Sequence, residues 1–232
     1  MISAIIVAAG KGTRMGLQTD KVFLEIAGRP VVAHTWQRFD ETPSIDEIIL
    51  VVRDGMQDVF ADLAAKFHFA KPYRLVVGGN ERQDSVWNGL QALSPGAEIV
   101  AIQDAARPCT SRQLIEATIA AARSDGAAVA AQPVSDTVKS SEGGGYVSQH
   151  LDRSRLWAVQ TPQTFRVDVI RRALREVRER GAQVTDDTAA CDLIGQRVKL
   201  VCVPGPNPKV TVPEDVPYVE MLLRNSAPTR AV

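Results

Sequence analysis

Residues 3–16 read SAIIVAAGKGTRMG, and Lys21 follows five residues after Gly16. A short apolar run leads directly into a glycine-rich turn, which is the pattern of a buried strand followed by a ligand-binding loop. Glycines let backbone N–H groups approach a polyphosphate closely, and Arg14 and Lys21 would neutralise its charge. The segment therefore predicts a nucleoside triphosphate site at the carboxyl end of the first strand.

The composition of the chain is that of an ordinary globular protein. Its 232 residues are enough for one large α/β domain or two small ones, and apolar residues make up 45% of them. Lys plus Arg and Asp plus Glu number 27 each, so the net charge is zero. This balance gives no support for a nucleic acid or a membrane surface as partner.

Two further features predict a cytoplasmic protein. The three cysteines, at positions 109, 191 and 202, are scattered, and their spacing fits neither a disulfide framework nor a metal site. The apolar run at residues 2–9 is too short for a secretory signal, and no run is long enough to span a bilayer. We therefore expect a soluble protein in a reducing compartment.

The rest of the chain alternates strand-like and helix-like segments. Short, almost entirely apolar runs predict strands at residues 3–8, 47–52, 74–77, 99–103, 127–134 and 199–203. Helical spacing and helix-start residues predict helices at residues 31–40, 55–67, 83–93, 112–124, 169–180 and 213–223. Apolar strands that alternate with helices are typical of a mostly parallel sheet covered on both faces. We expect one Rossmann-like α/β domain that spans residues 1–232.

Residues 135–154 interrupt this alternation. The segment is polar and contains Gly143-Gly144-Gly145, and residues 136–139 and 146–151 could pair as the strands of a β-hairpin. Such an excursion from a compact domain is either a functional loop or a dimerisation arm.

The glycines of the first loop have a second interpretation. Gly10, Gly12 and Gly16 superficially match the loops of dinucleotide-binding folds, where glycines allow the same close approach. However, the two cations make this loop more basic than a diphosphate requires. The second predicted strand also ends in Arg53-Asp54, without an acid at the expected spacing. The loop therefore favours a triphosphate over a dinucleotide.

Two further loops carry polar groups at predicted strand ends. Residues 78–86 read GGNERQDSV, which either offers backbone donors, an amide and a hydroxyl to a base edge or forms a glycine turn followed by a helix cap. Asp104 follows a buried strand, where open α/β sheets bind ligands, so it could hold Mg²⁺ while Arg107 binds a phosphate. The alternative is a mutual ion pair between Asp104 and Arg107.

Together these segments resemble the 2-C-methyl-D-erythritol 4-phosphate cytidylyltransferases of the non-mevalonate isoprenoid pathway. Each motif alone is modestly specific, but their order along nearly the whole chain is strongly specific. The similar segments are AAGKGTRM at 8–15 with Lys21, GGNERQDSV at 78–86, DAARP at 104–108, PVSDTVK at 133–139, DR at 152–153, LW at 156–157, QTPQ at 160–163, TD at 185–186, and KVT at 209–211 before PED at 213–215.

The resemblance implies a nucleotidyltransferase-type fold and one reaction. The phosphate of methylerythritol phosphate attacks the α-phosphorus of CTP, and pyrophosphate leaves. A phosphate monoester has a second pKa of about 6, so it is largely a dianion at pH 7 and needs no general base. None of His34, His68 and His150 lies in a motif. The reaction does need fixed cations and Mg²⁺ to stabilise a charge-rich transition state.

The resemblance also implies roles for individual residues. Arg14, Lys21, Arg153 and Lys209 would be catalytic, with Arg14 and Lys21 stabilising the transition state. The residues expected to bind CTP are Ala8, Ala9, Gly10, Gly12, Thr13, Gly79, Asn80, Ser85 and Asp104. The residues expected to bind methylerythritol phosphate are Asp104, Arg107, Thr137, Arg153, Thr161, Thr185 and Lys209. Asp104 is also the candidate metal ligand, the alternative being that the CTP phosphates hold the Mg²⁺.

In this family, the arm at residues 136–153 crosses to a partner subunit. The resemblance therefore implies a homodimer with two shared sites, in which Thr137 and Arg153 act on the site of the other chain.

Three positions depart from the family pattern. Asp20 stands before Lys21 where the family often has proline, and it could pair with Lys21 or Arg14. Asn80 replaces a frequent acidic residue in the cytosine loop, and its amide keeps an acceptor. The prolines of Pro206-Asn207-Pro208 should stiffen the approach of the lysine that follows.

Three other functions stay open at this point. A ribitol-5-phosphate cytidylyltransferase would share the CTP site, although the motifs around Arg153 and Thr161 favour methylerythritol phosphate. A nicotinamide-dependent oxidoreductase would carry a similar glycine loop. A non-catalytic nucleotide-binding regulator would have no need of Arg14 and Lys21, because a protein that only binds does not stabilise a transition state.

Overall fold

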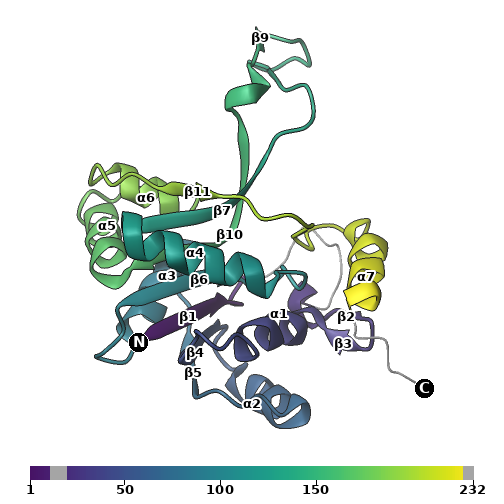
Figure 1. Ribbon diagram of the computed structural model, residues 1–232, viewed down its shortest axis with the longest axis vertical. Coiled ribbons are helices and arrows are strands. Elements are labelled where there is room, and N and C mark those ends of the chain that lie inside the picture. The colour runs from purple at the N-terminus through teal and green to yellow at the C-terminus, as the bar shows by residue number, and fades with distance from the viewer. Residues whose placement is uncertain (11–19, 227–232) are drawn as a thin grey trace.

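A seven-stranded sheet forms the centre of the computed structural model, which describes residues 1–10 and 20–226 (Figure 1). The order of the strands across the sheet is β11-β7-β10-β6-β1-β4-β5. Their bounds are Ile2–Val7 for β1, Glu47–Val52 for β4, Tyr73–Val77 for β5, Ile99–Asp104 for β6, Ala127–Pro133 for β7, Trp157–Arg166 for β10 and Lys199–Val201 for β11. All of these strands are parallel except β10, which runs antiparallel to both β6 and β7. The expected mostly parallel sheet is confirmed.

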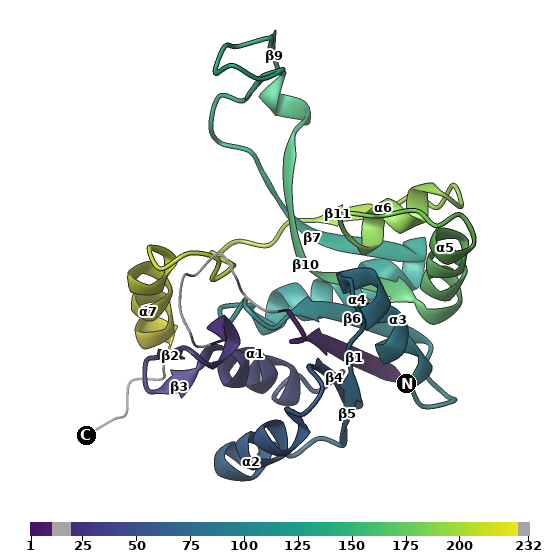
Figure 2. The same cartoon turned by 180° about the vertical axis from the view of Figure 1, so that it is seen from behind.

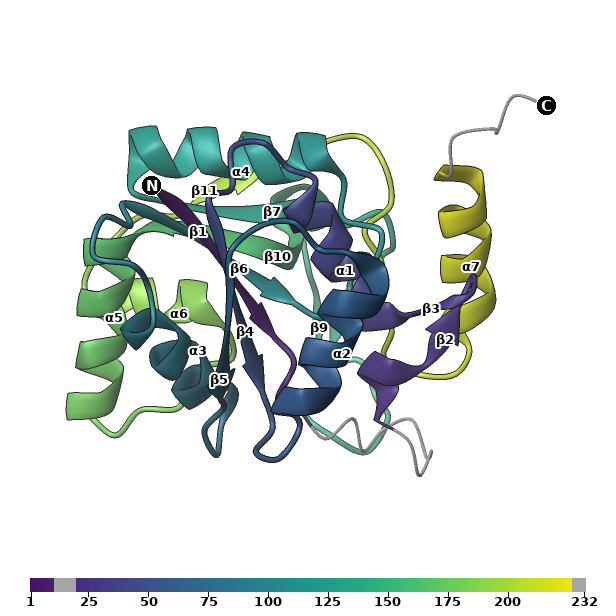
Figure 3. The same ribbon diagram turned by 90° about the horizontal axis from the view of Figure 1, so that it is seen from below.

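Helices cover both faces of this sheet (Figure 3). One face packs against α1 (Val31–Asp40), α2 (Gln57–Phe67) and α4 (Arg112–Asp125), and the other against α3 (Arg82–Gln91), α5 (Val167–Glu179) and α6 (Asp187–Asp192). In β1, Ile6 packs in the core with α1, whereas its neighbour Ile5 packs in the core with α3. Successive side chains of a strand point to opposite faces, so a strand covered on both sides must be apolar throughout. Over the described residues, no helix combines the length and hydropathy needed to cross a bilayer.

A small lobe lies beside the start of α1. β2 (Glu25–Ile26) and β3 (Arg29–Pro30) form a two-stranded hairpin, and α7 (Asp215–Ser226) packs against it. Ile26 and Val31 are buried together with Val219 of α7. This contact holds the C-terminal part of the chain against the segment that leads into α1.

β10 and α6 are elements that the sequence analysis missed. The sequence of β10, WAVQTPQTFR, is polar and contains proline, so it lacks the apolar run that predicts a buried strand. Residues 161–165 are nevertheless buried, because their polar side chains find partners. The Thr164 hydroxyl donates to the Thr118 hydroxyl (3.0 Å), and the Gln163 amide donates to the Asp186 carboxylate (2.9 Å).

The segment between β7 and β10 leaves the body of the molecule as an arm (Figures 1 and 2). β8 (Lys139–Ser140) and β9 (Gln149–His150) pair antiparallel in it, so the expected hairpin is confirmed with shorter strands. A 3₁₀ turn, η3 (Arg153–Arg155), follows. Tyr146 is 83% exposed and Val147 58% exposed. The role of the arm in dimerisation stays a prediction.

Gly89 tests whether packing or helix propensity decides the stability of α3. It lies on the buried face of this helix, where a Cβ would come within 2.9 Å of Ile5 Cγ2 and 3.0 Å of Val51 Cγ2. Alanine is favoured over glycine in a helix by about 1 kcal/mol, but overpacking a core costs about 1–3 kcal/mol. We therefore expect Gly89→Ala to lower the free energy of unfolding, measured by urea denaturation, by up to about 2 kcal/mol.

The matched control for this prediction is Ala65→Gly, at an exposed position of α2. It should cost only the propensity difference of about 1 kcal/mol. A Gly89→Ala protein more stable than the unmodified chain would contradict the packing argument.

Candidate active site

The candidate site lies where the carboxyl ends of β1 and β6 meet. Val7 pairs with Asp104 in the register of these two strands, so the loops that follow them begin side by side. Open α/β sheets bind their ligands at this edge. A cavity of about 190 Å³ opens there. The predicted residues that line it are Ala8, Ala9, Gly10, Lys21, Gly79, Asn80, Ser85, Asp104 and Lys209.

The first loop begins as a continuation of β1. The Ala8 amide donates to the carbonyl oxygen of Val51 (2.8 Å), which keeps Ala8 in the sheet and almost fully buried. Gly10 is exposed in the cavity. Lys21 begins a 3₁₀ turn, η2 (Lys21–Phe23), and also lines the cavity. The predicted residues Gly12, Thr13 and Arg14 lie outside the described part of the chain.

The loop between β5 and α3 is shaped by contacts of its own. The Ser85 hydroxyl accepts a hydrogen bond from the Gly79 amide (3.1 Å) and donates one to the Glu81 carbonyl oxygen (3.2 Å). A Cβ on Gly79 would come within 2.3 Å of Asp84 Cβ, so the turn requires glycine. Glu81 and Asp84 close a capping box at the start of α3. The helix cap that the sequence left as an alternative is therefore present, and the turn before it carries Asn80 to the cavity.

Asp104 is surrounded by cations. Its carboxylate lies 2.6 Å from Lys209 Nζ, 3.5 Å from Arg82 Nε and 3.9 Å from Arg107 Nε. Burial alone would raise the pKa of Asp104, but the three cations outweigh it and hold that pKa below its usual range. The pair with Arg107 that the sequence suggested is present as the longest of the three contacts.

This arrangement does not suit a metal ion bound directly by Asp104. Mg²⁺ binds carboxylate oxygens that are available to it, whereas here one oxygen faces Arg82 and the other faces Lys209 and Arg107. In residues 1–10 and 20–226, no group of three or more His, Cys, Asp or Glu side chains could hold a metal ion.

Lys209 follows a segment that is held firmly in place. The Asn207 side chain donates to the carbonyl oxygen of Thr161 (2.8 Å) and accepts from the Thr110 hydroxyl (2.9 Å). The Asn207 carbonyl oxygen accepts from Arg107 (2.7 Å). Asn207 is buried, so these bonds are shielded from water. They fix the approach to Lys209 in addition to the stiffening that the two neighbouring prolines predict.

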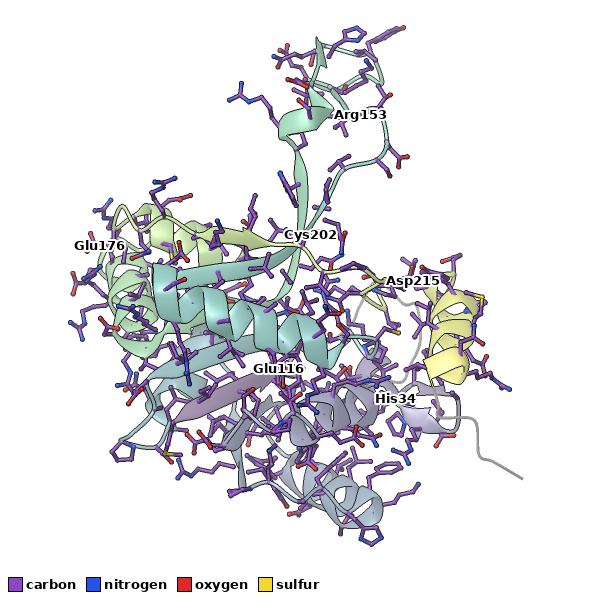
Figure 4. The ribbon with its side chains drawn as sticks, in the orientation of Figure 1. His34, Glu116, Arg153, Glu176, Cys202 and Asp215 are labelled. Atoms are coloured by element: carbon purple, nitrogen blue, oxygen red, sulfur yellow. The ribbon has the colours of Figure 1, made fainter. Side chains whose placement is uncertain are left out.

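The other predicted acceptor-binding residues lie in different surroundings. Thr161 is buried, and its hydroxyl accepts from the Asp104 amide (3.1 Å). Thr185 is exposed shortly before α6 and lines a neighbouring hollow rather than the cavity. Thr137 and Arg153 are exposed on the arm, and Figure 4 shows Arg153 far from the body of the molecule. Within one chain, the arm residues are therefore not brought to the cavity.

Arg82 and Asp187 belong to the charged network of the site, but the sequence analysis did not single them out. Arg82 lines the cavity, and its Nη2 lies 2.8 Å from the Asp187 carboxylate at the start of α6. Burial would lower the pKa of Arg82, but Asp187 and Asp104 outweigh it and raise that pKa. Burial also raises the pKa of the Asp187 carboxyl group. Arg82 lies within a quoted motif and Asp187 directly after one, so a signal existed, but nothing in the sequence pairs them.

Asp20 has a partner that the sequence did not suggest. Arg53 Nη2 lies 2.8 Å from Asp20 Oδ2. Arg53 directly follows β4, so this ion pair ties the residue before Lys21 to the end of the sheet.

Comparison with known proteins agrees with the motif pattern. The family model of 2-C-methyl-D-erythritol 4-phosphate cytidylyltransferase matches residues 2–225. A protein of that name from Pelotomaculum thermopropionicum is 41% identical over 224 residues, which are 96% of this chain and 94% of the relative. Another from Symbiobacterium thermophilum is 43% identical over 226 residues, 97% of this chain and 94% of the relative.

The crystal structure of 4-diphosphocytidyl-2C-methyl-D-erythritol synthase from Anaerococcus prevotii has a TM-score of 0.84 to this chain at 33% identity. The match covers 96% of this chain and 98% of that one. This likeness confirms a nucleotidyltransferase type of α/β fold and argues against the nicotinamide-dependent oxidoreductase. The chain belongs to the 2-C-methyl-D-erythritol 4-phosphate cytidylyltransferase family.

Proposed function

We propose that this chain transfers CMP from CTP to 2-C-methyl-D-erythritol 4-phosphate in the non-mevalonate isoprenoid pathway. The products are 4-diphosphocytidyl-2-C-methyl-D-erythritol and pyrophosphate. A phosphate oxygen of the acceptor forms a bond to the α-phosphorus of CTP, and the bond from that phosphorus to the pyrophosphate oxygen breaks. The observation that carries the proposal is the cavity itself, where Lys21 and Lys209 lie beside a glycine turn at the ends of parallel strands.

The nucleotide half of the proposal rests on the two loops at this edge. Small residues at Ala8, Ala9 and Gly79 allow a base and a ribose to approach the backbone closely. Asn80 would offer its amide to the cytosine edge, while Ser85 keeps the turn in shape. Gly10, Gly12, Thr13 and Arg14 would act on the triphosphate, as the resemblance implies.

The acceptor half of the proposal rests on the cations around Asp104. The acceptor phosphate is already largely a dianion at neutral pH, so the site has to attract and orient it rather than deprotonate it. Lys209 and Arg107 are fixed by hydrogen bonds and ion pairs before any ligand arrives. Preorganised cations of this kind stabilise charge in a transition state at little reorganisation cost.

We further propose that the protein works as a homodimer in which Thr137 and Arg153 complete the site of the partner. The exposure of both residues on an arm that stands away from its own cavity supports this arrangement (Figure 4). The exposed Tyr146 and Val147 near the tip of the arm are apolar surface suited to a protein partner.

The binding of Mg²⁺ is a further part of the proposal. Because Asp104 is already paired with cations, we propose that Mg²⁺ enters on the CTP phosphates, whose charge it neutralises, rather than on a protein-built site.

We also propose that the protein is located in the cytoplasm. This location is in keeping with the free cysteines Cys109, Cys191 and Cys202.

The test of the proposed function is pyrophosphate release from CTP with each of two acceptors. We expect release with methylerythritol 4-phosphate and Mg²⁺, and none when EDTA replaces the metal. Release with ribitol 5-phosphate alone would instead assign the chain to polyol-phosphate activation at the same nucleotide site. Binding of CTP without release from either acceptor would favour the nucleotide-binding regulator.

Lys21 is expected to act in the transition state. Removal of one preorganised donor typically lowers kcat by about 100- to 1000-fold. Lys21→Ala should therefore lower kcat by at least about 100-fold, while calorimetry still detects CTP binding. Lys66→Ala, at an exposed position of α2, is the control and should retain full turnover. A Lys21→Ala protein with normal kcat would refute the assigned role.

Arg153 is expected to bind the acceptor of the partner subunit. Arg153→Ala should mainly raise the acceptor KM, whereas Arg155→Ala on the same turn should change it little. Mixing Arg153→Ala chains with Lys21→Ala chains should restore part of the activity, because half of the mixed dimers' sites would then be intact. The absence of any recovery after subunit exchange would contradict action between chains.

A further inference from the structure

Arg82 joins the nucleotide side of the cavity to its acceptor side. It is the first residue of α3 and directly follows the turn that carries Asn80 to the cavity. Its guanidinium reaches across to two carboxylates, Asp104 at 3.5 Å and Asp187 at 2.8 Å. Asp104 ends β6, whereas Asp187 begins α6, two residues after Thr185. One side chain thus contacts the end of β6, which carries Asp104, and the start of α6, which follows Thr185.

The geometry of the guanidinium suits two partners at once. Arg82 Nε faces Asp104 Oδ1, and Arg82 Nη2 faces Asp187 Oδ2. A planar, rigid guanidinium can present different edges to two carboxylates, whereas a lysine ammonium is a point charge on a flexible stem. The bridge therefore requires arginine and not merely a positive charge.

The two carboxylates depend on Arg82 to different degrees. Asp104 also has Lys209 and Arg107 as partners. Asp187 has a side chain only 1% exposed, and Arg82 is its one ion-pair partner among the described residues. Apart from this pair, neither carboxylate oxygen of Asp187 has a hydrogen-bond partner there. A buried carboxylate without its cation is strongly unfavourable, so Asp187 holds Arg82 and Arg82 holds Asp187.

Arg82 also sets the orientation of the Asp104 carboxylate. Oδ1 of Asp104 faces Arg82, while Oδ2 faces Lys209 Nζ at 2.6 Å. With Arg82 in place, the carboxylate is held from both sides, and the lysine ammonium has one defined position at the cavity. Without it, the carboxylate can rotate and Lys209 loses that fixed position.

We propose that Arg82 and Asp187 form one positioning unit, which orients Asp104 and, through Asp104, places Lys209 toward the acceptor phosphate. The inference rests on the proposed function. The unit acts on the acceptor half of the site although Arg82 belongs to the nucleotide loop. Its loss therefore lowers kcat/KM for the acceptor by a larger factor than it weakens CTP binding.

The first experiment measures the activity and the CTP binding of the Arg82→Lys variant. This variant keeps the positive charge but cannot bridge both carboxylates. We expect kcat/KM for methylerythritol 4-phosphate to fall at least tenfold. The Kd for CTP, measured by calorimetry without acceptor, should rise by a clearly smaller factor. Arg112→Lys is the matched control, since Arg112 is the first residue of α4 and pairs with Glu116 on the surface. It should leave both quantities unchanged.

The second experiment tests whether the two residues act as one unit. Asp187→Asn should lower acceptor kcat/KM on its own, and the double variant with Arg82→Lys should be no worse than the Arg82→Lys protein within threefold. Residues that act independently would instead multiply their losses. Thermal unfolding of each variant shows whether it is folded at the assay temperature.

The results of the two experiments either support the positioning unit or contradict it. Three results would contradict the positioning unit. The first is an equal loss in CTP affinity and in acceptor kcat/KM, and the second is a multiplicative loss of acceptor kcat/KM in the double variant. The third is an Arg82→Lys protein whose acceptor kcat/KM equals that of the unmodified enzyme. If the unmodified enzyme is active and the variants have the same acceptor kcat/KM, this inference is refuted and the proposed function is not. If the unmodified enzyme releases no pyrophosphate with either acceptor, both the proposed function and this inference are refuted.

Discussion

Asp104 carries a largely buried carboxylate that three cations share, and two of these cations come from distant parts of the chain. Arg82 begins α3, Arg107 lies in the loop after β6, and Lys209 follows β11. Burial raises the pKa of this carboxyl group, but the surrounding cations outweigh burial, lower the pKa and stabilise the carboxylate. In the same way, the cations keep their fixed positions only while the carboxylate is charged. The side of the cavity that we propose for the acceptor depends on this mutual arrangement, because Lys209 lines the cavity while it is paired with Asp104.

The sheet provides the frame in which this contact can form. Parallel pairing of β1 with β6 sets Val7 opposite Asp104, so the first glycine loop and the acidic strand end share one edge. The antiparallel strand β10 then enters between β6 and β7 and delivers Thr161 to the Asp104 amide. Two residues further along the strand, Gln163 accepts from the Asp187 amide (3.0 Å) and so anchors α6. Backbone pairing thus brings the start of the first glycine loop, Asp104 and Thr161 to one edge of the sheet.

Much of the fold could be predicted because hydrophobic patterns report local structure. The apolar runs that became β1, β4 and β6 are covered by helices on both faces, and such coverage leaves a continuous run in the sequence. β10 could not be predicted in this way. Its buried side chains Thr164 and Gln163 are polar and are satisfied by Thr118 and Asp186, which lie far away in the sequence. A strand whose burial depends on hydrogen bonds to distant residues carries no periodic apolar signal of its own.

The sequence alone determined the alternation of strands and helices, the glycine turns and the residue types at the strand ends, since each depends on neighbours a few positions apart. On that basis it also placed Lys21, Gly79 and Asp104 among the candidate residues, and the family resemblance added Lys209; all four line one cavity. Only the tertiary structure decided which charges from distant segments meet. Lys209 bonds a carboxylate 105 positions earlier, and Arg82 bridges Asp104 and the buried Asp187. Ion pairs between distant segments depend on strand order and register, and a buried charge has to find its partner wherever the fold brings one.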